Sequence, residues 1–304
     1  MRYSLRQLEV FLATARHENV TRAAASLAMS QSAASGALKE LESQFGVQLF
    51  DRIGKRLALS ALGHELRPQA ENLLAQARAL EHALAGEEAE GRLHIGATLT
   101  IGNYLAVGMI ADFRRDHPRA DIALHVANTA TIAAGVAGFE LDMGLIEGEL
   151  LHRELDAVHW RDDELVVFAN PDHPLAGAAA LSDSDLLAQQ WIIRESGSGT
   201  RQTFERAMHG IVTDLSIAME LQHTEAIKRA VEAGLGVGCL SRIALQEAFR
   251  RGSLVPLHVP GRNFHRELYM VTHRRKYHGP ALRQWLQLCR QHGAASGPEA
   301  PPHG

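Results

Sequence analysis

The sequence has few of the features that indicate a membrane protein, a disulfide-bonded protein or a zinc protein. Its 304 residues contain no run of about 18 apolar residues, and the N-terminal pattern is amphipathic rather than a basic segment followed by an apolar one. The two cysteines, Cys239 and Cys289, are fifty positions apart, which argues against a disulfide framework or a zinc site. We therefore expect a cytoplasmic protein with no membrane contact, no metal and no cofactor.

Positive charge is scarce overall and unevenly distributed. The formal net charge is −4, yet residues 1–63 hold eight basic and five acidic side chains, a local charge of +3 that leaves −7 for the remainder. A small basic N-terminal segment followed by an acidic remainder is typical of a DNA-binding module joined to a domain with another function. The length and the 46% of hydrophobic residues allow at least two domains with their own cores.

Three short helices are predicted in the first 46 residues. Ser4 can cap a first helix, and Thr21 is the candidate cap of a second, alanine-rich helix over 22–28. Ser30 opens a third helix that runs from Gln31 to about Gln44, where Gly46 supplies a left-handed C-cap. The second and third helices are separated only by a very short turn, as in a helix-turn-helix.

The third helix has two faces of different character. The inner, apolar face comprises Ala34, Ala37, Leu38, Leu41 and Phe45. The opposite face is small and polar, and a major groove admits a helix only when its leading side chains are slim enough to reach base edges. Gln31, Ser32 and Ser35 are therefore the candidate base contacts. An ordinary solvated helix face is the alternative, and this pattern alone leaves it open.

A basic hairpin follows the third helix. Residues 47–50 and 57–59 are predicted as two short strands around a tip that contains Arg52, Lys55 and Arg56. Such side chains can neutralise phosphates and position the protein without reading sequence. A merely solvated hairpin is the alternative, but its place directly after a helix-turn-helix favours a wing.

Several segments of this region resemble LysR-type transcriptional regulators. The resemblance is continuous through residues 5–11, 21–24, 30–35, 38–42 and 49–52. It implies a regulator, not an enzyme, that binds double-stranded promoter DNA. Thr21, Arg22 and Lys39 complete the predicted set of DNA-binding residues.

A heptad-like pattern follows the wing. Apolar residues recur at alternating spacings of four and three, at Leu66, Ala70, Leu73, Ala77, Leu80 and Leu84. We predict a linker and dimerisation helix over 64–90, with Leu66, Leu73, Leu80 and Leu84 in a seam between chains, after a DNA-binding domain over 1–63. A helix packed on its own body is the alternative. The resemblance also implies a linker that dimerises, and a homotetramer.

From residue 92 onward, strand-like runs alternate with helical patterns, which indicates an α/β domain. The predicted strands are 93–97, 122–126, 142–146, 165–169, 191–193, 237–240 and 268–272. Ligands of such sheets lie at the carboxyl ends of the strands, where hydroxyls and glycines recur in this sequence. The predicted effector-binding residues are Thr98, Leu99, Thr100, Thr129, Glu147, Ser196, Gly197, Ser198, Gly199, Thr200 and Thr224.

Residues 196–200 are the most suggestive of these segments. A glycine-serine turn that opens a helix presents free amides and the positive end of the helix dipole, which suit a small anion. The segment lacks the Gly-Lys-Ser/Thr of a Walker loop and the spacing of a nucleophile elbow. A capped helix preceded by a flexible turn is the alternative.

The resemblance to the family extends over this body. It implies a two-lobed, periplasmic-binding-protein-like (type 2) effector domain over 91–292, with lobe I at about 92–161 and 266–292 and lobe II at about 162–265. Residues 96–105, 194–201 and 225–228 resemble the CysL-like branch, which is associated with sulfur metabolism and sulfite. A small oxyanion is therefore the expected effector, whose binding would alter promoter binding or DNA bending.

An amino acid or another small organic acid is the alternative effector, although aromatic residues, at 5%, offer little to sandwich a ring. An enzyme or a solute-binding protein is the alternative class. The acidic cluster 162–164 is most simply a solvated turn, and no histidine pair has metal-ligand spacing with a carboxylate partner. The tail 293–304, rich in proline and glycine, is expected to be disordered.

Overall fold

The computed structural model describes residues 2–54, 56–84 and 92–294. The chain divides into two compact units, which are described separately below. One unit comprises Met1–Gly91 with Arg274–Arg283, and the other comprises Arg92–His273 with Gln284–Gly304. Residues 274–283, which the sequence placed in lobe I, therefore group with the N-terminal unit.

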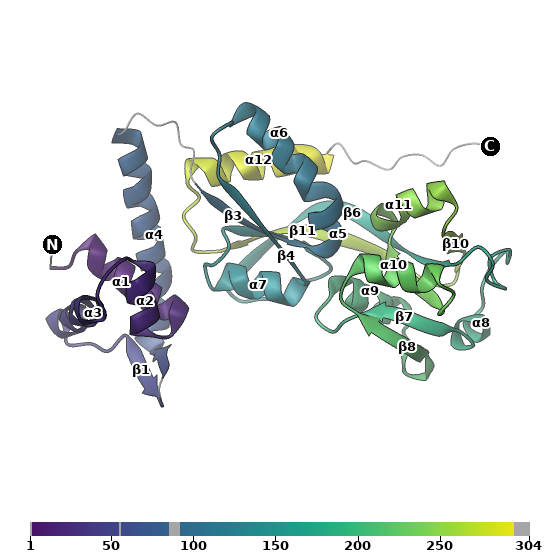
Figure 1. Ribbon diagram of the computed structural model, residues 1–304, viewed down its shortest axis with the longest axis horizontal. Helices are drawn as coiled ribbons and strands as arrows, with labels where there is room; N and C mark the ends of the chain where they lie inside the picture. Colours follow the sequence, from purple (N-terminus) through teal and green to yellow (C-terminus); the bar gives the residue numbers. More distant parts are fainter. Residues whose placement is uncertain (1, 55, 85–91, 295–304) are drawn as a thin grey trace. The chain divides into compact units, whose positions relative to one another are not determined.

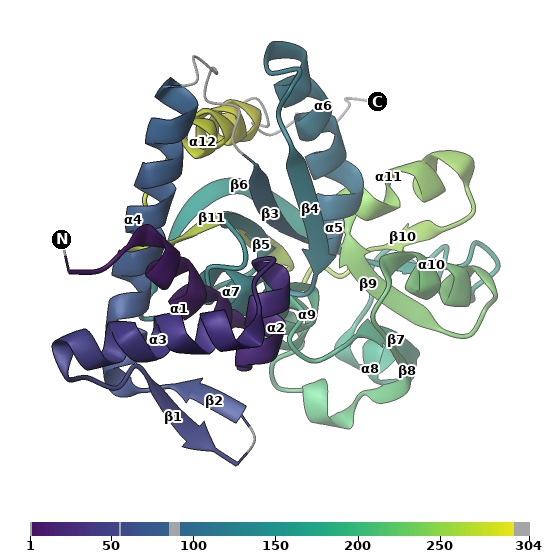
Figure 2. The ribbon, with the colours of Figure 1, turned by 60° about the vertical axis from the view of Figure 1, so that its left-hand side comes forward.

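The N-terminal unit is a winged helix-turn-helix followed by a long helix (Figures 1 and 2). Its elements are α1 (Leu5–His17), α2 (Val20–Ser26), α3 (Gln31–Phe45), β1 (Phe50–Ile53), β2 (Arg56–Leu59) and α4 (Ala61–Leu84). The predicted caps at Ser4 and Ser30 are confirmed, because each side chain accepts a hydrogen bond from a first-turn amide. Gly46 ends α3 at φ 65°, in the predicted left-handed conformation.

Two boundaries in this unit differ from the prediction. Thr21 does not cap α2; the side chain of Asn19 accepts from the Arg22 amide, and the helix begins one residue before Thr21. The first wing strand begins at Phe50 rather than at residue 47. The reason is that Leu49 N donates to Glu42 Oε1 at 2.7 Å, which ties this segment to α3.

The core of the unit is formed by all four helices and the wing. Ala34, Leu38 and Leu41 are buried as predicted, but Phe45 is 45% exposed at the end of α3 and lies outside the core. The first half of α4 contributes Ala70 to the same core. The long helix is therefore part of this unit and begins at Ala61, three residues before the predicted linker.

The second unit contains one mixed sheet with strand order β4-β3-β5-β11-β6-β9-β7-β8, and β10 pairs with β6. The strands are β3 (Leu93–Thr98), β4 (Ile122–Ala127), β5 (Met143–Glu147), β6 (Leu155–Ala169), β7 (Gln190–Arg194), β8 (Ser216–Leu221), β9 (Val237–Ser241), β10 (Val255–Leu257) and β11 (His265–His273). Strand β11 pairs over its whole length with residues 155–164 of β6, and these two strands join the two halves.

Helices cover both faces of this sheet. They are α5 (Leu99–Ile101), the π-helix η1 (Gly102–Ala106), α6 (Val107–Asp116), α7 (Thr129–Ala137), α8 (Asp183–Leu187), α9 (Gly199–Ala207), the 3₁₀ helix η2 (Val212–Asp214), α10 (Thr224–Glu232), α11 (Arg242–Arg251) and α12 (Pro280–Ala294). In the first half, α6 and α12 lie on one face and α7 on the other (Figure 1). In the second half, α8 and α9 build one core and α10 and α11 the other.

All seven predicted strands of the second unit are present, and the α/β fold class is confirmed. The sequence missed β8, β10 and residues 155–164 of β6. The cluster 162–164 lies within β6 rather than in a turn, and Asp163 is buried. In the tail, Gly293 and Ala294 are helical and contradict predicted disorder there, whereas residues 295–304 lie outside the described residues.

Within the described part of the chain, no helix is both long enough and apolar enough to cross a bilayer.

Candidate DNA interface and effector site

The polar face of α3 is exposed, and the helix is fixed to α1. Gln31, Ser32, Ser35 and Lys39 are all exposed. Ser32 Oγ lies 3.1 Å from Ser30 Oγ, and the other three side chains have no hydrogen-bond partner within the described residues. On the inner side, Gln7 Nε2 donates to Glu40 Oε2 at 3.1 Å and fixes α3 against α1. The helix thus presents free donors and acceptors on a rigid support, which suits base contact.

The wing lies beside α3 in both ribbon views (Figures 1 and 2). Ile53 pairs with Arg56, so the hairpin turn is two residues long, and Gly54 supports it at φ 63°. Arg52 is exposed without an ion-pair partner within the described ranges. Arg56 is 81% exposed and lies 4.0 Å from Glu18.

The remaining predicted DNA contacts are Thr21, Arg22 and Lys55. Thr21 and Arg22 are exposed on α2. Lys55 lies outside the described residues. The roles of all nine predicted DNA-binding residues stay predictions, although those described are accessible.

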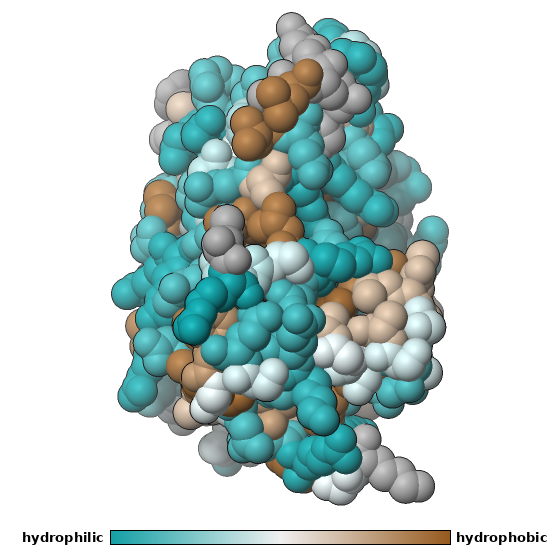
Figure 3. Space-filling view, turned by 90° about the vertical axis from the view of Figure 1, so that its left-hand side faces the viewer, coloured by the Kyte–Doolittle hydropathy of each residue, from teal (hydrophilic) through white to brown (hydrophobic). Residues whose placement is uncertain are grey.

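The predicted seam of α4 divides into two parts. Leu66 and Leu73 are partly buried against the core of their own unit. Leu80 and Leu84 are 61% and 80% exposed. Hydrophobic side chains gather near the C-terminal end of α4, next to the grey segment at the top of Figure 3. Leu66 and Leu73 thus pack as in the alternative of a helix on its own body, whereas Leu80 and Leu84 are exposed among the described residues.

A buried arginine organises the centre of the second unit. Arg266 of β11 is 1% exposed, and its guanidinium lies 2.9 Å from Glu147 Oε2 and 2.6 Å from Asp163 Oδ2. It also donates to Thr200 Oγ1 at 2.9 Å and to Thr100 Oγ1 at 3.4 Å. Three predicted effector residues, far apart in sequence, therefore meet around a residue that the sequence analysis missed.

Glu147 accepts hydrogen bonds from two of the predicted effector-binding residues. Its carboxylate accepts from Thr100 N at 2.8 Å and from Thr200 Oγ1 at 2.9 Å. Burial alone would raise the pKa of Glu147, but the Arg266 guanidinium and these hydrogen bonds outweigh burial and lower the pKa to about 2. The carboxylate is therefore ionised and fully paired, and it holds these donors in place.

Residues 197–200 are mainly engaged in packing. Ser198 caps α9 by accepting from the Arg201 amide, and Gly197 O accepts from Ala130 N at 3.2 Å. A Cβ on Gly199 would lie 1.9 Å from Glu147 O, so only glycine allows this approach. Thr129 Oγ1 donates to the same carbonyl at 3.0 Å. The alternative of a capped helix accounts for these contacts, while Ser196 is exposed.

Two predicted hydroxyls remain without partners. Thr98 and Thr224 are 2% and 1% exposed, and within the described residues neither Oγ1 has a hydrogen-bond partner. Thr98 precedes α5 and Thr224 begins α10, and neither helix has a side-chain cap. Buried hydroxyls without partners are costly, so they indicate a place where a ligand or water supplies the missing bond.

A polar contact connects η1 with the start of α10. Tyr104 Oη donates to Glu225 Oε1 at 2.5 Å, and Lys228 Nζ donates to the same oxygen at 2.7 Å. Lys228 is only 5% exposed, and its ammonium lies 5.7 Å from the centre of the Tyr104 ring. Burial and this hydrogen bond raise the pKa of Tyr104. Leu99, also predicted, is buried between Thr98 and Thr100.

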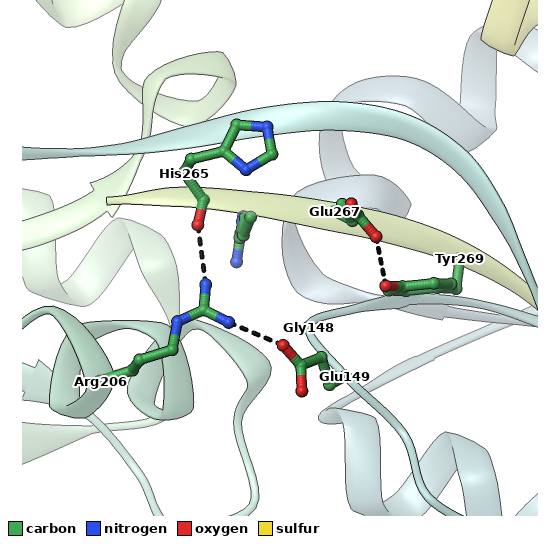
Figure 4. A pocket seen from close by; sticks show the side chains of 7 residues that line it. Gly148, Glu149, Arg206, His265, Glu267 and Tyr269 are labelled. Atoms are coloured by element: carbon green, nitrogen blue, oxygen red, sulfur yellow. Dashed lines mark hydrogen bonds and ion pairs between the residues drawn. The ribbon is translucent and has the colours of Figure 1, made fainter. Parts of the chain in front are cut away.

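A separate cavity of about 100 Å³ lies at β11 and was not predicted (Figure 4). Arg206 of α9 borders it, with an ion pair to Glu149 at 2.9 Å and a hydrogen bond to His265 O at 2.8 Å. Glu267 and Tyr269 lie on another side and are hydrogen-bonded to each other. The effector residues predicted from sequence are absent from its lining.

Known proteins resemble the chain over nearly its whole length. YeiE of Escherichia coli (strain K12), named as an HTH-type transcriptional regulator, is 42% identical over 95% of this chain and 98% of its own. The RuBisCO operon transcriptional regulator of Allochromatium vinosum is 35% identical over 92% and 93%, respectively. CysL of Bacillus subtilis (strain 168) is 30% identical over 87% and 89%. Sequence identity to these regulators therefore does not assign the chain to the CysL-like branch.

Family and fold comparisons agree with the two units. Full-length OxyR from Pseudomonas aeruginosa has a TM-score of 0.73 at 22% identity, over 99% of this chain and 100% of its own, which shows a shared fold. Residues 5–64 match the family described as "Bacterial regulatory helix-turn-helix protein, lysR family". Residues 86–294 match "LysR substrate binding domain". The chain belongs to the LysR family of transcriptional regulators.

Proposed function

We propose that the effector of this DNA-binding regulator is a small oxyanion that binds between the N-terminal turns of α5 and α10. The observation that carries the proposal is the pair of buried hydroxyls without partners, Thr98 and Thr224. Sulfite is the first ligand to test, because the sequence segments quoted above resemble the CysL-like branch. An amino acid or another small organic acid is the alternative.

The donors near these hydroxyls suit an anion. His223 does not cap α10 with its side chain, so the amides of the first turn of this nine-residue helix remain available, together with the positive end of the helix dipole. Lys228 adds a buried ammonium on the same helix, which is paired with the Glu225 carboxylate at 2.7 Å. The contact of Tyr104 with Glu225 brings η1 to this turn. Neutral donors can satisfy a small anion together with a cation, and an anion bound here would share Lys228 with Glu225.

The proposed position differs from the one first expected. The carboxylate of Glu147 already uses the Thr100 amide and the Thr200 hydroxyl, so an oxyanion there would face a negative charge. Arg266 compensates that charge from within the protein. The effector therefore lies beside the Glu147 network, and the network supports the helices that bind it.

Calorimetry on the full-length protein tests the proposal, with sulfite, sulfate and thiosulfate as ligands. Thr98→Val and Thr224→Val each remove one hydroxyl and should weaken binding roughly threefold to tenfold, about the value of one hydrogen bond. Thr213→Val, at an exposed threonine of η2, is the matched control and should bind like the wild type. Heat from amino acids or organic acids but none from the three oxyanions would contradict the proposal.

We propose that Gln31, Ser32 and Ser35 contact bases and that Arg52, Lys55 and Arg56 contact phosphates. Thr21, Arg22 and Lys39 contact DNA at the edges of this interface.

Chains pair through Leu80 and Leu84 and assemble further into a homotetramer. A ligand shifts such an equilibrium only by preferring one state, so the effector would favour one lobe arrangement and thereby change promoter binding or bending.

A further inference from the structure

Three potential metal ligands, His159, Asp162 and Glu267, gather on one face of β6 and β11, and His265 lies beside Asp162. His159 Nε2 lies 3.1 Å from Asp162 Oδ1, and His265 Nε2 lies 3.5 Å from the same oxygen. Ligand atoms of His159, Asp162 and Glu267 all lie within 4.8 Å of one another. Neither the DNA interface nor the effector site uses these side chains.

A β-bulge makes the cluster possible. Successive side chains of a strand alternate between faces, so residues three apart, such as His159 and Asp162, would normally project to opposite sides. The register shifts here: Leu268 pairs with Arg161 and Tyr269 with His159, which leaves Trp160 as an extra residue on β6. The bulge returns His159 to the face of Asp162, and bulges commonly redirect side chains in this way near functional sites.

The charges of the cluster call for a cation. Glu267 pairs directly with Asp162 across the two strands, and like charges in this position destabilise a sheet. Asp162 Oδ1 lies near the imidazoles of His159 and His265, and Glu267 accepts a hydrogen bond from the Tyr269 hydroxyl. Within the described ranges, neither carboxylate has a lysine or arginine partner. An ion between them would turn the repulsion into attraction.

We propose that His159, Asp162, His265 and Glu267 bind a divalent transition-metal ion of the zinc class. Imidazole nitrogens and carboxylate oxygens are ligands of Zn²⁺, with bonds of about 2.0–2.2 Å. Tetrahedral ligands at that radius lie roughly 3.4 Å apart. The distances from Asp162 to His159 and His265 lie on either side of this value, whereas Glu267 lies within 4.8 Å of His159 and Asp162, and His265 would have to move closer to both His159 and Glu267 on binding. Two neutral histidines and two carboxylates also neutralise a charge of +2.

The proposed site lies behind the buried network. The residues that follow Asp162 and His265 in their strands are Asp163 and Arg266, whose side chains pair with each other in the interior. Because β6 and β11 join the two halves of the sheet, a bound ion would link the strands that carry the central arginine. The site is thus placed to stabilise the effector domain from its outer surface.

The test uses untagged full-length protein freed of metal with a chelator. Zn²⁺ titrated by calorimetry should bind with one equivalent per chain, and Co²⁺ should give the intense visible bands of four-coordination. The double variant His159→Gln/His265→Gln should lose at least about tenfold in affinity, since it removes two of four ligands. His209→Gln, at an exposed histidine outside the cluster, should bind like the wild type.

A second variant separates metal binding from simple stability. Glu267→Gln removes the cross-strand repulsion, so it should raise the Tm of the metal-free protein and abolish the further rise that Zn²⁺ causes in the wild type. Equal Zn²⁺ affinity in the double variant and the His209→Gln control would overturn the proposal. So would the absence of a stoichiometric Zn²⁺ site in the wild type, or an undiminished Zn²⁺-induced rise in Glu267→Gln.

Discussion

The two units use polar side chains in opposite ways. On α3 and the wing, the predicted contacts are exposed and largely without partners, so they are available to DNA. In the effector domain, Thr100, Glu147 and Thr200 are buried and bound to one another around Arg266. A surface site can therefore be recognised as a periodic polar face, whereas the residues of a buried site are paired with partners that local sequence does not reveal.

The largest expected effect tests the buried network. Arg266→Leu leaves Glu147 and Asp163 as buried charges without compensation and should lower the free energy of unfolding by about 3–5 kcal/mol. Urea denaturation measures it. Arg242→Leu is the matched control, because Arg242 forms a half-exposed ion pair with Glu164 at 2.8 Å. This substitution should lower the free energy of unfolding by only about 0–1 kcal/mol. Similar losses in both variants would remove the contrast between buried and surface pairs.

The second prediction concerns pH. The pKa of Glu147 is about 2 in the folded protein and 4.5 ordinarily, so its contribution is fully present above the unfolded value and is lost as pH falls toward 2. The free energy of unfolding of the wild type should therefore exceed that of Glu147→Gln near pH 7. This difference should shrink as the pH falls below about 4.5. Urea titrations at several pH values measure this. A difference independent of pH would mean that Glu147 is not ionised.

The third prediction sharpens the comparison along α4. Leu80→Glu places a charge in the exposed half of the seam and should weaken dimerisation by about 1.5–3 kcal/mol per chain, the value of burying one leucine. Leu73→Glu should instead destabilise its own unit, since Leu73 packs on that core. Light scattering and thermal unfolding distinguish the two. Gln76→Glu, exposed on the same helix, is the control; an unchanged molar mass for Leu80→Glu would refute the seam.

The smallest expected effect concerns DNA sequence preference. Gln31→Ala should cost about 1–3 kcal/mol on the specific operator and little on random duplex. Arg52→Ala should weaken both duplexes alike and reduce the salt slope by about 1. Anisotropy titrations at several salt concentrations separate the two contributions. Equal losses on both duplexes for both variants would show that α3 does not read bases.

Most of the fold could be predicted because its signals are local. The caps at Ser4 and Ser30, the left-handed Gly46 and the seven apolar strands each depend on neighbouring residues. The missed elements lack such signals. Strand β8 is mostly exposed, and the missed part of β6, residues 155–164, carries the charges of 162–164, so neither has the apolar run that indicates a strand.

The candidate effector site was predicted in part. Thr98, Thr100 and Thr224 follow or precede recognisable elements, and their burial agrees with a site at the strand ends. Arg266 could not be found, because its strand carries no local signal for a site and its partners lie over 60 residues away in sequence. The histidines of the proposed metal site were likewise dismissed, since their approach depends on strand pairing and a bulge.

The sequence by itself determined the family, the winged helix-turn-helix and the α/β class, because periodicity, capping and a continuous resemblance are properties of adjacent residues. Only the tertiary structure decided which polar groups are already paired. In the folded chain Glu147 is paired with Arg266, whereas the hydroxyls of Thr98 and Thr224 have no partner within the described residues. Leu66 and Leu73 of the predicted α4 seam pack on the core of their own unit. The physical reason is that burial and pairing depend on distances between residues remote in sequence, and these distances exist only once the chain has folded.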